Sequence, residues 1–338
     1  MVPKKINSSA GIHLWAGFSG VTLEEELKFL ISEYHIGGIV LFRRNVEGPE
    51  QLGALLREAQ SFARETMGRG LLVSIDQEGG PVQRLAPPHF PSLPSARDLA
   101  RLGPEAVSDA AGGAARELRR IGIQVNLAPV LDVVGNQADH FMEARSLGSD
   151  PERVGRLGKL WIEAMQREGV SATAKHFPGL GHAQLDPHHF APVIRWETPE
   201  ALTGDMLPFR DAVRAGAHCV MTSHALYPDL DPKWPATLSP AVNRKWLRER
   251  LGFDGILLSD DMDMAAISAN YGWDAAVRQG LLASIDSFLL CQRGENLEPF
   301  FRELSEAPRR LPELAAAMAE SRQRLERLLL RHDLLSLR

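Results

Sequence analysis

Eight short apolar runs, separated by longer amphipathic stretches, constrain the fold of this chain more than any other feature. Each run has the length and the aliphatic content of a buried strand, and each longer stretch has the spacing of a helix. The expected strands are His13–Ser19, Gly38–Phe42, Leu71–Asp76, Gln124–Val130, Ser171–His176, His218–Ser223, Gly255–Asp260 and Asp286–Cys291. The expected helices are Leu23–Tyr34, Pro49–Met67, Pro104–Ile121, Pro151–Glu168, Pro199–Ala215, Pro240–Leu251 and Ala265–Ser284.

This alternation predicts an α/β fold in which eight strands and their helices form one (β/α)8 barrel. An open doubly wound sheet is the alternative, but no glycine-rich phosphate-binding sequence follows the first expected strand. The length of 338 residues suits one barrel domain over residues 1–338, with the barrel over about residues 12–295. Apolar residues at helical spacing from Pro312 to Leu335 predict one or two extra helices. Residues 296–338 are therefore expected to pack on the barrel.

Charge and composition limit the partners that we expect. The net charge is −5, from 38 basic and 43 acidic residues, and there is no long basic tract, so nucleic acid is not an expected partner. No apolar run reaches the length of a membrane-spanning helix, and Met1–Asn7 is not followed by the apolar core of a signal peptide. We expect a monomeric, cytoplasmic protein with Cys219 and Cys291 as reduced core residues.

Polar residues collect where the expected strands end, which is where barrel enzymes carry their chemistry. They are Asp76, Glu78 and Arg84 after the third strand, Glu143 and Arg145 after the fourth, Lys175 and His176 on the fifth, His224 after the sixth and Asp260 on the seventh. Asp260 directly follows a buried run, and burying its charge without a role would be costly. Asp76 has a structural alternative, because it could cap a helix or pair with Arg84.

A glycine-bearing loop after the fifth strand carries Asp186 and His188, two residues apart. Side chains at this spacing point to the same side of an extended chain, so the carboxylate can orient the imidazole. Such a pair is the acid/base unit of a hydrolytic site. A histidine-rich surface loop is the alternative, and this segment alone does not decide between them.

Other polar residues have structural interpretations. Asp261 and Asp263 are expected to start the seventh helix, where acids favour the positive end of the helix dipole. Asp132 is expected to serve the fold, and Glu143 stays undecided. His182 and His189 are expected to be loop residues without a catalytic role, while His224 could line the pocket.

Three ordered motifs span most of the chain. They are Ile75-Asp76-Gln77-Glu78-Gly79-Gly80 with Val82-Gln83-Arg84, then Lys175-His176-Phe177-Pro178-Gly179-x-Gly181-x(4)-Asp186-x-His188, then Ser259-Asp260-Asp261-Met262. Together they resemble the motifs of the β-N-acetylglucosaminidases of glycoside hydrolase family 3. The sequence departs from the family pattern at Pro81, Leu180 and Pro187, where the family commonly has arginine, histidine, and serine or threonine.

The resemblance implies a retaining exo-β-N-acetylglucosaminidase that works in two steps. Asp260 would be the nucleophile, and His188 paired with Asp186 would be the acid and base. The positions that match the family's sugar-binding residues are Asp76, Arg84, Arg145, Lys175 and His176. No metal or organic cofactor is implied. The family's cytoplasmic members remove N-acetylglucosamine from muropeptides during recycling of the cell wall.

Four alternatives stay open at the level of the sequence. A family 3 phosphorylase is one, since a histidine acid does not repel an incoming phosphate, and a β-glucosidase acting on another sugar is the second. A metal hydrolase is a third, although the spacing of His176, His182, Asp186, His188 and His189 fits no zinc motif. The fourth is a sugar-binding module, which the presence of both Asp260 and His188 argues against.

Overall fold

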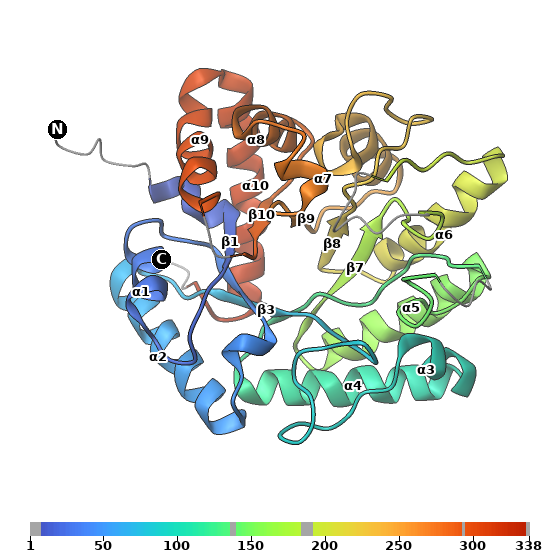
Figure 1. The fold of residues 1–338 in the computed structure, drawn as a ribbon, viewed down its shortest axis with the longest axis horizontal. Helices are drawn as coiled ribbons and strands as arrows, with labels where there is room; N and C mark the ends of the chain where they lie inside the picture. Colours follow the sequence, from blue (N-terminus) through green and yellow to red (C-terminus); the bar gives the residue numbers. More distant parts are fainter. Residues whose placement is uncertain (1–7, 136–139, 184–191, 293–294, 336–338) are drawn as a thin grey trace.

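The computed structural model describes residues 8–135, 140–183, 192–292 and 295–335, and these form a closed barrel of eight parallel strands (Figure 1). The strands follow one another round the barrel in chain order, and the last pairs with the first. They are β1 (Leu14–Gly17), β2 (Gly38–Leu41), β3 (Leu72–Ile75), β6 (Val125–Asn126), β7 (Ser171–Phe177), β8 (Cys219–Thr222), β9 (Ile256–Asp261) and β10 (Ser287–Leu290). The predicted (β/α)8 barrel is therefore confirmed.

Helices surround the barrel and connect its strands (Figure 1). They are η1 (Ser8–His13), α1 (Glu25–Ser32), η2 (Arg43–Asn45), α2 (Pro49–Met67), α3 (Ala96–Leu102), α4 (Pro104–Ile121), α5 (Pro151–Arg167), α6 (Pro199–Arg214), η3 (Ala236–Leu238), η4 (Ala241–Arg250), α7 (Ala265–Ser268), α8 (Trp273–Leu282), α9 (Leu297–Arg310) and α10 (Pro312–Arg331). A short antiparallel pair, β4 (Gln77–Gly79) and β5 (Val82–Gln83), follows β3. None of the helices in the described residues combines the length and apolar composition that crossing a membrane requires.

Two sequence-based expectations differ from the structure. The single helix expected over Ala265–Ser284 is wrong, because α7 ends at Ser268 and α8 begins at Trp273. The Asn270 side chain donates to the carbonyl of Ala265 at 2.9 Å and so caps α7 at its end. The strand expected over Gln124–Val130 is shortened to β6, because the Asn126 side-chain amide exchanges hydrogen bonds with the Gln77 backbone in place of a longer ladder.

One apolar cluster fills the barrel. It contains alternate residues of the strands, which point to one side of the sheet, and residues of α10. The strand residues are Trp15, Val40, Leu72, Val125, Cys219, Met221, Ile256, Leu258 and Leu289, and the α10 residues are Leu325, Leu328 and Leu329. Just beyond α10, His332 Nε2 lies 2.8 Å from Ser171 Oγ at the start of β7. The C-terminal end of α10 thus lies at the amino ends of the strands.

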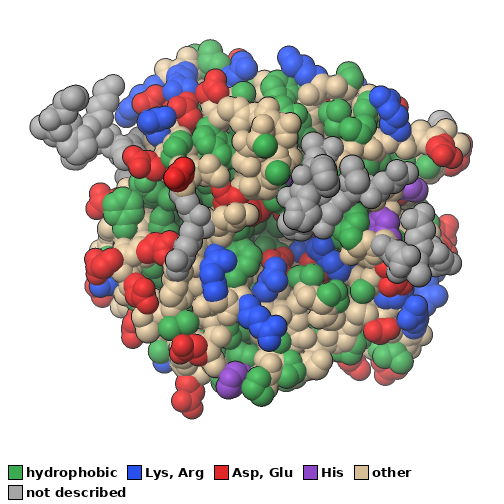
Figure 2. Space-filling model, viewed as in Figure 1, with side chains coloured by type: hydrophobic (Ala, Val, Ile, Leu, Met, Phe, Trp, Pro, Cys, Tyr) green, Lys and Arg blue, Asp and Glu red, His purple; other side chains and the backbone are tan. Residues whose placement is uncertain are grey.

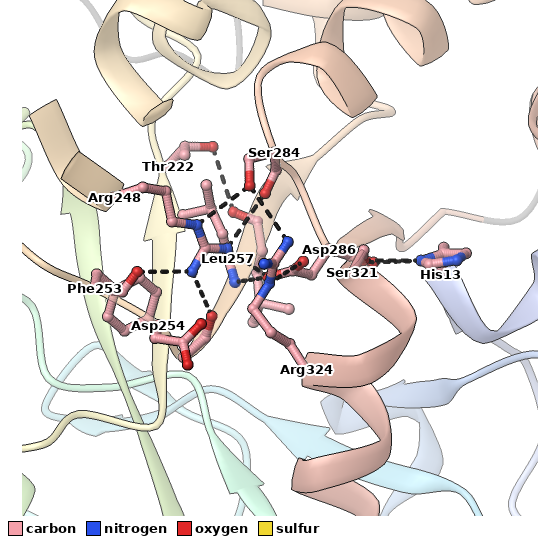
Figure 3. Close-up of polar contacts among 12 residues, drawn as sticks. His13, Thr222, Arg248, Phe253, Asp254, Leu257, Ser284, Asp286, Ser321 and Arg324 are labelled. Atoms are coloured by element: carbon pink, nitrogen blue, oxygen red, sulfur yellow. Dashed lines mark hydrogen bonds and ion pairs between the residues drawn. The ribbon is translucent and has the colours of Figure 1, made fainter. Parts of the chain in front are cut away.

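Asp286 ties the outer elements to the barrel just before β10 (Figure 3). Its buried carboxylate accepts from Arg248 of η4 at 2.7 Å and from Arg324 of α10 at 2.9 Å. Its carbonyl oxygen accepts from His13 Nδ1 at 3.0 Å and from Ser321 Oγ at 3.2 Å. This network closes the amino end of the barrel, so the opposite end is where a ligand can enter.

Candidate active site

A cavity of about 160 Å³ lies at the carboxyl ends of the barrel strands. Its walls combine charged side chains with an apolar base that includes Val40, Met221 and Leu289. Figure 2 shows this face hollowed near its centre, with acidic and basic side chains gathered at the hollow. The charged residues in the wall are Asp76, Glu78, Arg84, Arg145, Lys175, His176, Asp260 and Asp261. The five predicted sugar-binding positions and the predicted nucleophile therefore lie together in one cavity.

Lys175 links two carboxylates at the base of this cavity. Its Nζ donates to Asp76 Oδ1 at 2.8 Å and pairs with Glu78 Oε1 at 2.7 Å. Arg145 holds the same Glu78 with two parallel hydrogen bonds of 2.8 Å, from Nε and Nη2. Arg84 Nη2 reaches Asp76 Oδ2 at 3.4 Å. The alternation of charges keeps each side chain in place before any ligand binds.

Burial and charge act in opposite directions on these groups. Burial works against the charged form of Glu78, but Lys175 and Arg145 outweigh it and lower the pKa of this carboxyl below its ordinary value. Burial likewise opposes the charge of Lys175, and Asp76 and Glu78 outweigh it, so the pKa of the ammonium is raised. Glu78 and Lys175 are consequently both charged at neutral pH.

Two neighbouring residues of β7 line the same cavity, although neighbours on a regular strand point to opposite sides. The pairing of β7 with β8 shifts register between Lys175 and Phe177. Such an irregularity re-aims a side chain at the end of a strand. Both Lys175 and His176 therefore face the ligand space.

Asp132 fixes the position of His176 through contacts with its ring and its backbone. Its Oδ2 lies 2.7 Å from His176 Nδ1, and its Oδ1 accepts from the backbone amides of His176 at 3.2 Å and Leu180 at 2.7 Å. Asp132 is fully buried. The expectation that Asp132 serves the fold alone is incomplete, because its contacts orient a cavity-lining ring and the start of the following loop.

Asp260 lies in the cavity wall at the end of β9 and is partly buried. The Asp261 amide donates to Asp260 Oδ1 at 2.8 Å. Burial acts to raise the pKa of Asp260, but the imidazoles of His176 and His224, the Asp261 amide and Lys175 together lower the pKa below its ordinary value. An ionised carboxylate therefore faces the cavity.

The expectation that Asp261 and Asp263 start the next helix is wrong, because the first turn of α7 contains no acidic residue. Asp263 instead accepts from the Gln292 amide at 2.9 Å and from Asn296 Nδ2 at 2.9 Å. Its carboxylate joins the β9–α7 turn to the loop after β10. Asp261 lines the cavity.

Three further candidates lie outside the cavity wall. Glu143 forms an ion pair with Arg97 at 3.2 Å, which gives this undecided residue a structural role. His224 could have lined the pocket on sequence grounds, but it is 1% exposed and donates from Nε2 to the Asp261 carbonyl at 2.9 Å. His182 is half exposed and lies 3.4 Å from Asp205, which raises the pKa of His182 through a hydrogen bond.

The predicted acid/base pair, Asp186 and His188, lies outside the described residues, as do Pro187 and His189. Of the other departures from the family pattern, Leu180 lines the cavity with an apolar side chain, and Pro81 is exposed. In the described ranges no three His, Cys, Asp or Glu side chains converge where they could hold a metal ion.

Glu78 and Asp132 have larger roles in the structure than the sequence motifs predict. Glu78 has the same i, i+2 relation to Asp76 that singled out Asp186 and His188, so its orientation was accessible from the sequence. Asp132 and His176 are 44 positions apart in the chain, so no local sequence pattern predicts their contact.

An ionised carboxylate and the linked side chains of Asp76, Glu78, Arg84, Arg145 and Lys175, called here the charged cradle, lie in one cavity at the strand ends, where (β/α)8 enzymes have their active sites. Comparison with known protein families identifies the class of enzyme. The model of the glycosyl hydrolase family 3 N terminal domain matches residues 11–330. The chain therefore belongs to glycoside hydrolase family 3, and it is a glycoside hydrolase.

Individual relatives agree with this assignment. A beta-hexosaminidase of Thioalkalivibrio sulfidiphilus is 36% identical over 304 residues, which cover 86% of this chain and 83% of the relative. The family 3 beta-N-acetylglucosaminidase of Paenibacillus sp. str. FPU-7 superposes with a TM-score of 0.91 at 36% identity, covering 98% of this chain and 64% of that protein. The beta-N-acetylhexosaminidase of Beutenbergia cavernae superposes with a TM-score of 0.86 at 28% identity, covering 97% and 99%.

Proposed function

We propose that this protein is a retaining exo-β-N-acetylglucosaminidase, which removes terminal N-acetyl-β-glucosamine from a glycoside. The observation that carries the proposal is Asp260, an ionised carboxylate in the wall of the cavity beside His176. A retaining mechanism requires an ionised carboxylate as its nucleophile, and Asp260 meets this requirement. The names of the beta-hexosaminidase and beta-N-acetylglucosaminidase relatives support the choice of sugar.

The reaction has two steps. Asp260 attacks the anomeric carbon, and the bond to the leaving oxygen breaks as His188 gives that oxygen a proton. In the second step His188 takes a proton from water, which attacks the same carbon and releases Asp260. Asp186 orients the ring of His188. The roles of Asp186 and His188 rest on the sequence motif.

The charged cradle binds the sugar. The carboxylate of Asp76 accepts hydrogen bonds from sugar hydroxyls, whereas Arg84, Arg145 and Lys175 donate to sugar oxygens. The ring of His176 also lines the sugar site, and its contact with Asp132 fixes the orientation of the ring. Because Lys175 and Arg145 already pair with Glu78, the donors do not have to be ordered when the sugar arrives.

The natural substrate is a muropeptide, and the reaction belongs to the recycling of peptidoglycan in the cytoplasm. This part of the proposal follows from the resemblance between the sequence motifs and those of the family's recycling enzymes. The protein acts as a monomer of one domain, with residues 296–338 as an appendage of the barrel, and its partner is the sugar substrate rather than nucleic acid or a membrane.

The test of this function is the substitution Asp260→Asn, which keeps the shape of the side chain and removes its attacking charge. Turnover of an aryl N-acetyl-β-glucosaminide is expected to fall by a factor of about 10³ or more. A fluorinated slow substrate is expected to add one sugar to the wild type, and peptide mapping by mass spectrometry should place it on Asp260. Glu143→Gln, which changes an acid outside the cavity wall, is the matched control and should keep near-normal turnover.

Label on another residue, or near-normal turnover by Asp260→Asn, would contradict the proposed nucleophile. The same assay, repeated with and without inorganic phosphate, separates hydrolysis from phosphorolysis. Hydrolysis predicts free N-acetylglucosamine in both cases, whereas a phosphorylase would release the sugar 1-phosphate when phosphate is present. A panel of other aryl β-glycosides tests the choice of sugar.

A further inference from the structure

A second carboxyl group, that of Asp261, lies in the cavity wall directly after Asp260. Only one of its oxygens is engaged by backbone donors: Oδ1 accepts from the amides of Asp263 and Cys291, each at 3.1 Å. Within the described residues no donor reaches Oδ2, and no ion pair involves this carboxyl. The group is thus held at one oxygen, and the proposed two-step reaction does not use it.

The charged and titratable groups around Asp261 come from every strand end near it. They are Asp260 on β9, Asp263 in the turn, His224 after β8, Lys175 and His176 on β7, Cys291 after β10, Asp76 after β3 and Arg44 of η2, whose Nη2 donates to the Cys291 carbonyl at 2.8 Å. Lys175 is committed to Asp76 and Glu78, and His224 meets the Asp261 backbone carbonyl. Asp263 and Asp260, the sequence neighbours of Asp261, bring negative charge.

These surroundings favour the neutral form of the carboxyl. Burial first, and then the charges of Asp263 and Asp260, raise the pKa of Asp261 to about 7, against the two amide hydrogen bonds that lower it. Because Oδ1 accepts from two amides, the proton of the neutral form belongs on Oδ2. At slightly acidic pH the cavity then contains one carboxyl group that can donate a hydrogen bond.

We infer that neutral Asp261 is a substrate-binding residue, whose Oδ2–H donates to an oxygen of the bound sugar beside the nucleophile. Glu78 and Asp260, whose pKa values are lowered, are ionised and can only accept hydrogen bonds, so Asp261 supplies a donor where these two acids supply none. When Asp261 ionises, this donor is lost and a second negative charge appears next to Asp260. Sugar binding weakens accordingly as the pH rises. The kinetic part of this inference rests on the proposed function.

The substitution Asp261→Asn separates this role from a role as a carboxylate. Asparagine keeps an oxygen for the amides of Asp263 and Cys291, places an N–H donor where Oδ2–H would be, and does not titrate. Asp261→Ala removes both the donor and the acceptor. Asp274→Asn is the matched control, because it makes the same chemical change at an exposed acid in the first turn of α8, outside the cavity wall.

The first measurement is the urea midpoint of unfolding, which does not depend on activity. A carboxyl whose folded pKa lies above its unfolded value of about 3.9 destabilises the folded state progressively as the pH rises from about 4 to about 7. Asp261→Asn removes this loss. Its midpoint is expected to exceed that of the wild type by more at pH 8 than at pH 5, and the control Asp274→Asn should not show this pattern.

The second measurement is the KM of an N-acetyl-β-glucosaminide of nitrophenol between pH 5 and pH 9. With this activated leaving group, the first step depends little on protonation by a histidine. The wild-type KM is expected to rise several-fold above pH 7, while the KM of Asp261→Asn stays within about twofold. Asp261→Ala should have a KM about tenfold above that of the wild type at pH 5, the effect of one lost hydrogen bond, and this KM should not rise further above pH 7.

Equal loss of activity at pH 6 in Asp261→Asn and Asp261→Ala would overturn the inference, because it would mean that the carboxylate itself is needed. A midpoint difference that is the same at pH 5 and pH 8 would also overturn it. If Asp260→Asn kept its activity, the proposed function would fail, whereas the midpoint measurement would still test the neutral form of Asp261 on its own.

Discussion

Glu78 shows how one residue can order a whole cavity. It is 3% exposed and faces Lys175 at 2.7 Å and Arg145 at 2.8 Å. Two cations and one anion, removed from water, gain little free energy over an apolar packing of the same volume. Removing the anion alone is different, because buried Arg145 would then lose its carboxylate partner and buried Lys175 would lose one of its two. Glu78 therefore matters to stability and to the shape of the sugar site.

Glu78→Gln is expected to lower the free energy of unfolding at pH 7 by about 3–5 kcal/mol, the usual cost of breaking a buried ion pair. The pKa of Glu78 is lowered in the folded state, so its stabilisation is fully present above the unfolded value of about 4.3 and is lost as the pH falls below it. Urea unfolding of both proteins at pH 7 and pH 3.5 checks the size and the direction of this effect.

Glu117→Gln is the matched control, since Glu117 pairs with Arg120 at 2.7 Å on the exposed side of α4 and the same chemical change should cost little there. A loss in Glu78→Gln as small as in this control would contradict the structural role of Glu78. So would a difference from the wild type that did not shrink between pH 7 and pH 3.5.

The residues of the cradle were predictable because their motifs follow strands that the sequence already marked. Asp76, Arg145 and Lys175 belong to three different strand–loop junctions, and a barrel brings such junctions together. Their distances and the pairing with Glu78 were not predictable, since these depend on side chains 67 to 99 positions apart in the chain. The contact between Asp132 and His176 was not predictable for the same reason, because the two residues are far apart in the chain.

At the scale of the elements, helix α10 covers the amino end of the barrel. Leu325 and Leu329 of α10 are fully buried and share one apolar cluster with Trp15 and other barrel residues. Arg324 of the same helix pairs with Asp286 at 2.9 Å (Figure 3). The helix thus contributes packing and charge at the end of the barrel opposite the cavity.

Leu329→Ala is expected to lower the free energy of unfolding by about 2–5 kcal/mol, because a large buried side chain leaves a void that its neighbours fill only in part. Leu102→Ala, at a position that is 72% exposed, is the control and should change stability by less than about 0.5 kcal/mol. Below the unfolding transition, kcat/KM of Leu329→Ala should match the wild type. A loss of activity without a loss of stability would contradict the division of tasks between the two ends.

Elements were predictable where a local signal marks their ends. Proline and the residue before it marked the starts of α2 and α4, and both helices begin and end at the predicted residues. The break between α7 and α8 was missed, because it depends on a side chain, Asn270, folding back onto the carbonyl of Ala265. Apolar spacing continues across the break and does not reveal it.

At the scale of the whole molecule, the two ends of the barrel carry different kinds of polar groups. The carboxyl end holds the charged cavity. The amino end holds three sheltered histidines: His13 contacts the carbonyl of Asp286, and His218 and His332 both contact Ser171 Oγ. Burial lowers the pKa of each of these histidines to about 4, in spite of the raising effect of Asp286 on His13. The molecule therefore has a built-in sensitivity to mild acid at the end away from its site.

That sensitivity has a defined direction. A histidine with a folded pKa of about 4 and an unfolded value of about 6.5 binds more protons when unfolded in the interval between these values. The free energy of unfolding consequently falls as the pH falls from about 6.5 to about 4. For buried His13 alone, the loss at pH 5 amounts to about 2 kcal/mol, from 1.5 pH units at about 1.4 kcal/mol each.

His13→Gln tests this, because glutamine can still donate to the Asp286 carbonyl but does not titrate. Its free energy of unfolding in urea is expected to fall by about 2 kcal/mol less than that of the wild type between pH 7.5 and pH 5.0. His89→Gln, which changes an exposed histidine, is the control and should keep the wild-type pH dependence. If His13→Gln lost as much stability as the wild type over this interval, another group would have to cause the acid sensitivity, and His218 and His332 would be the next to substitute.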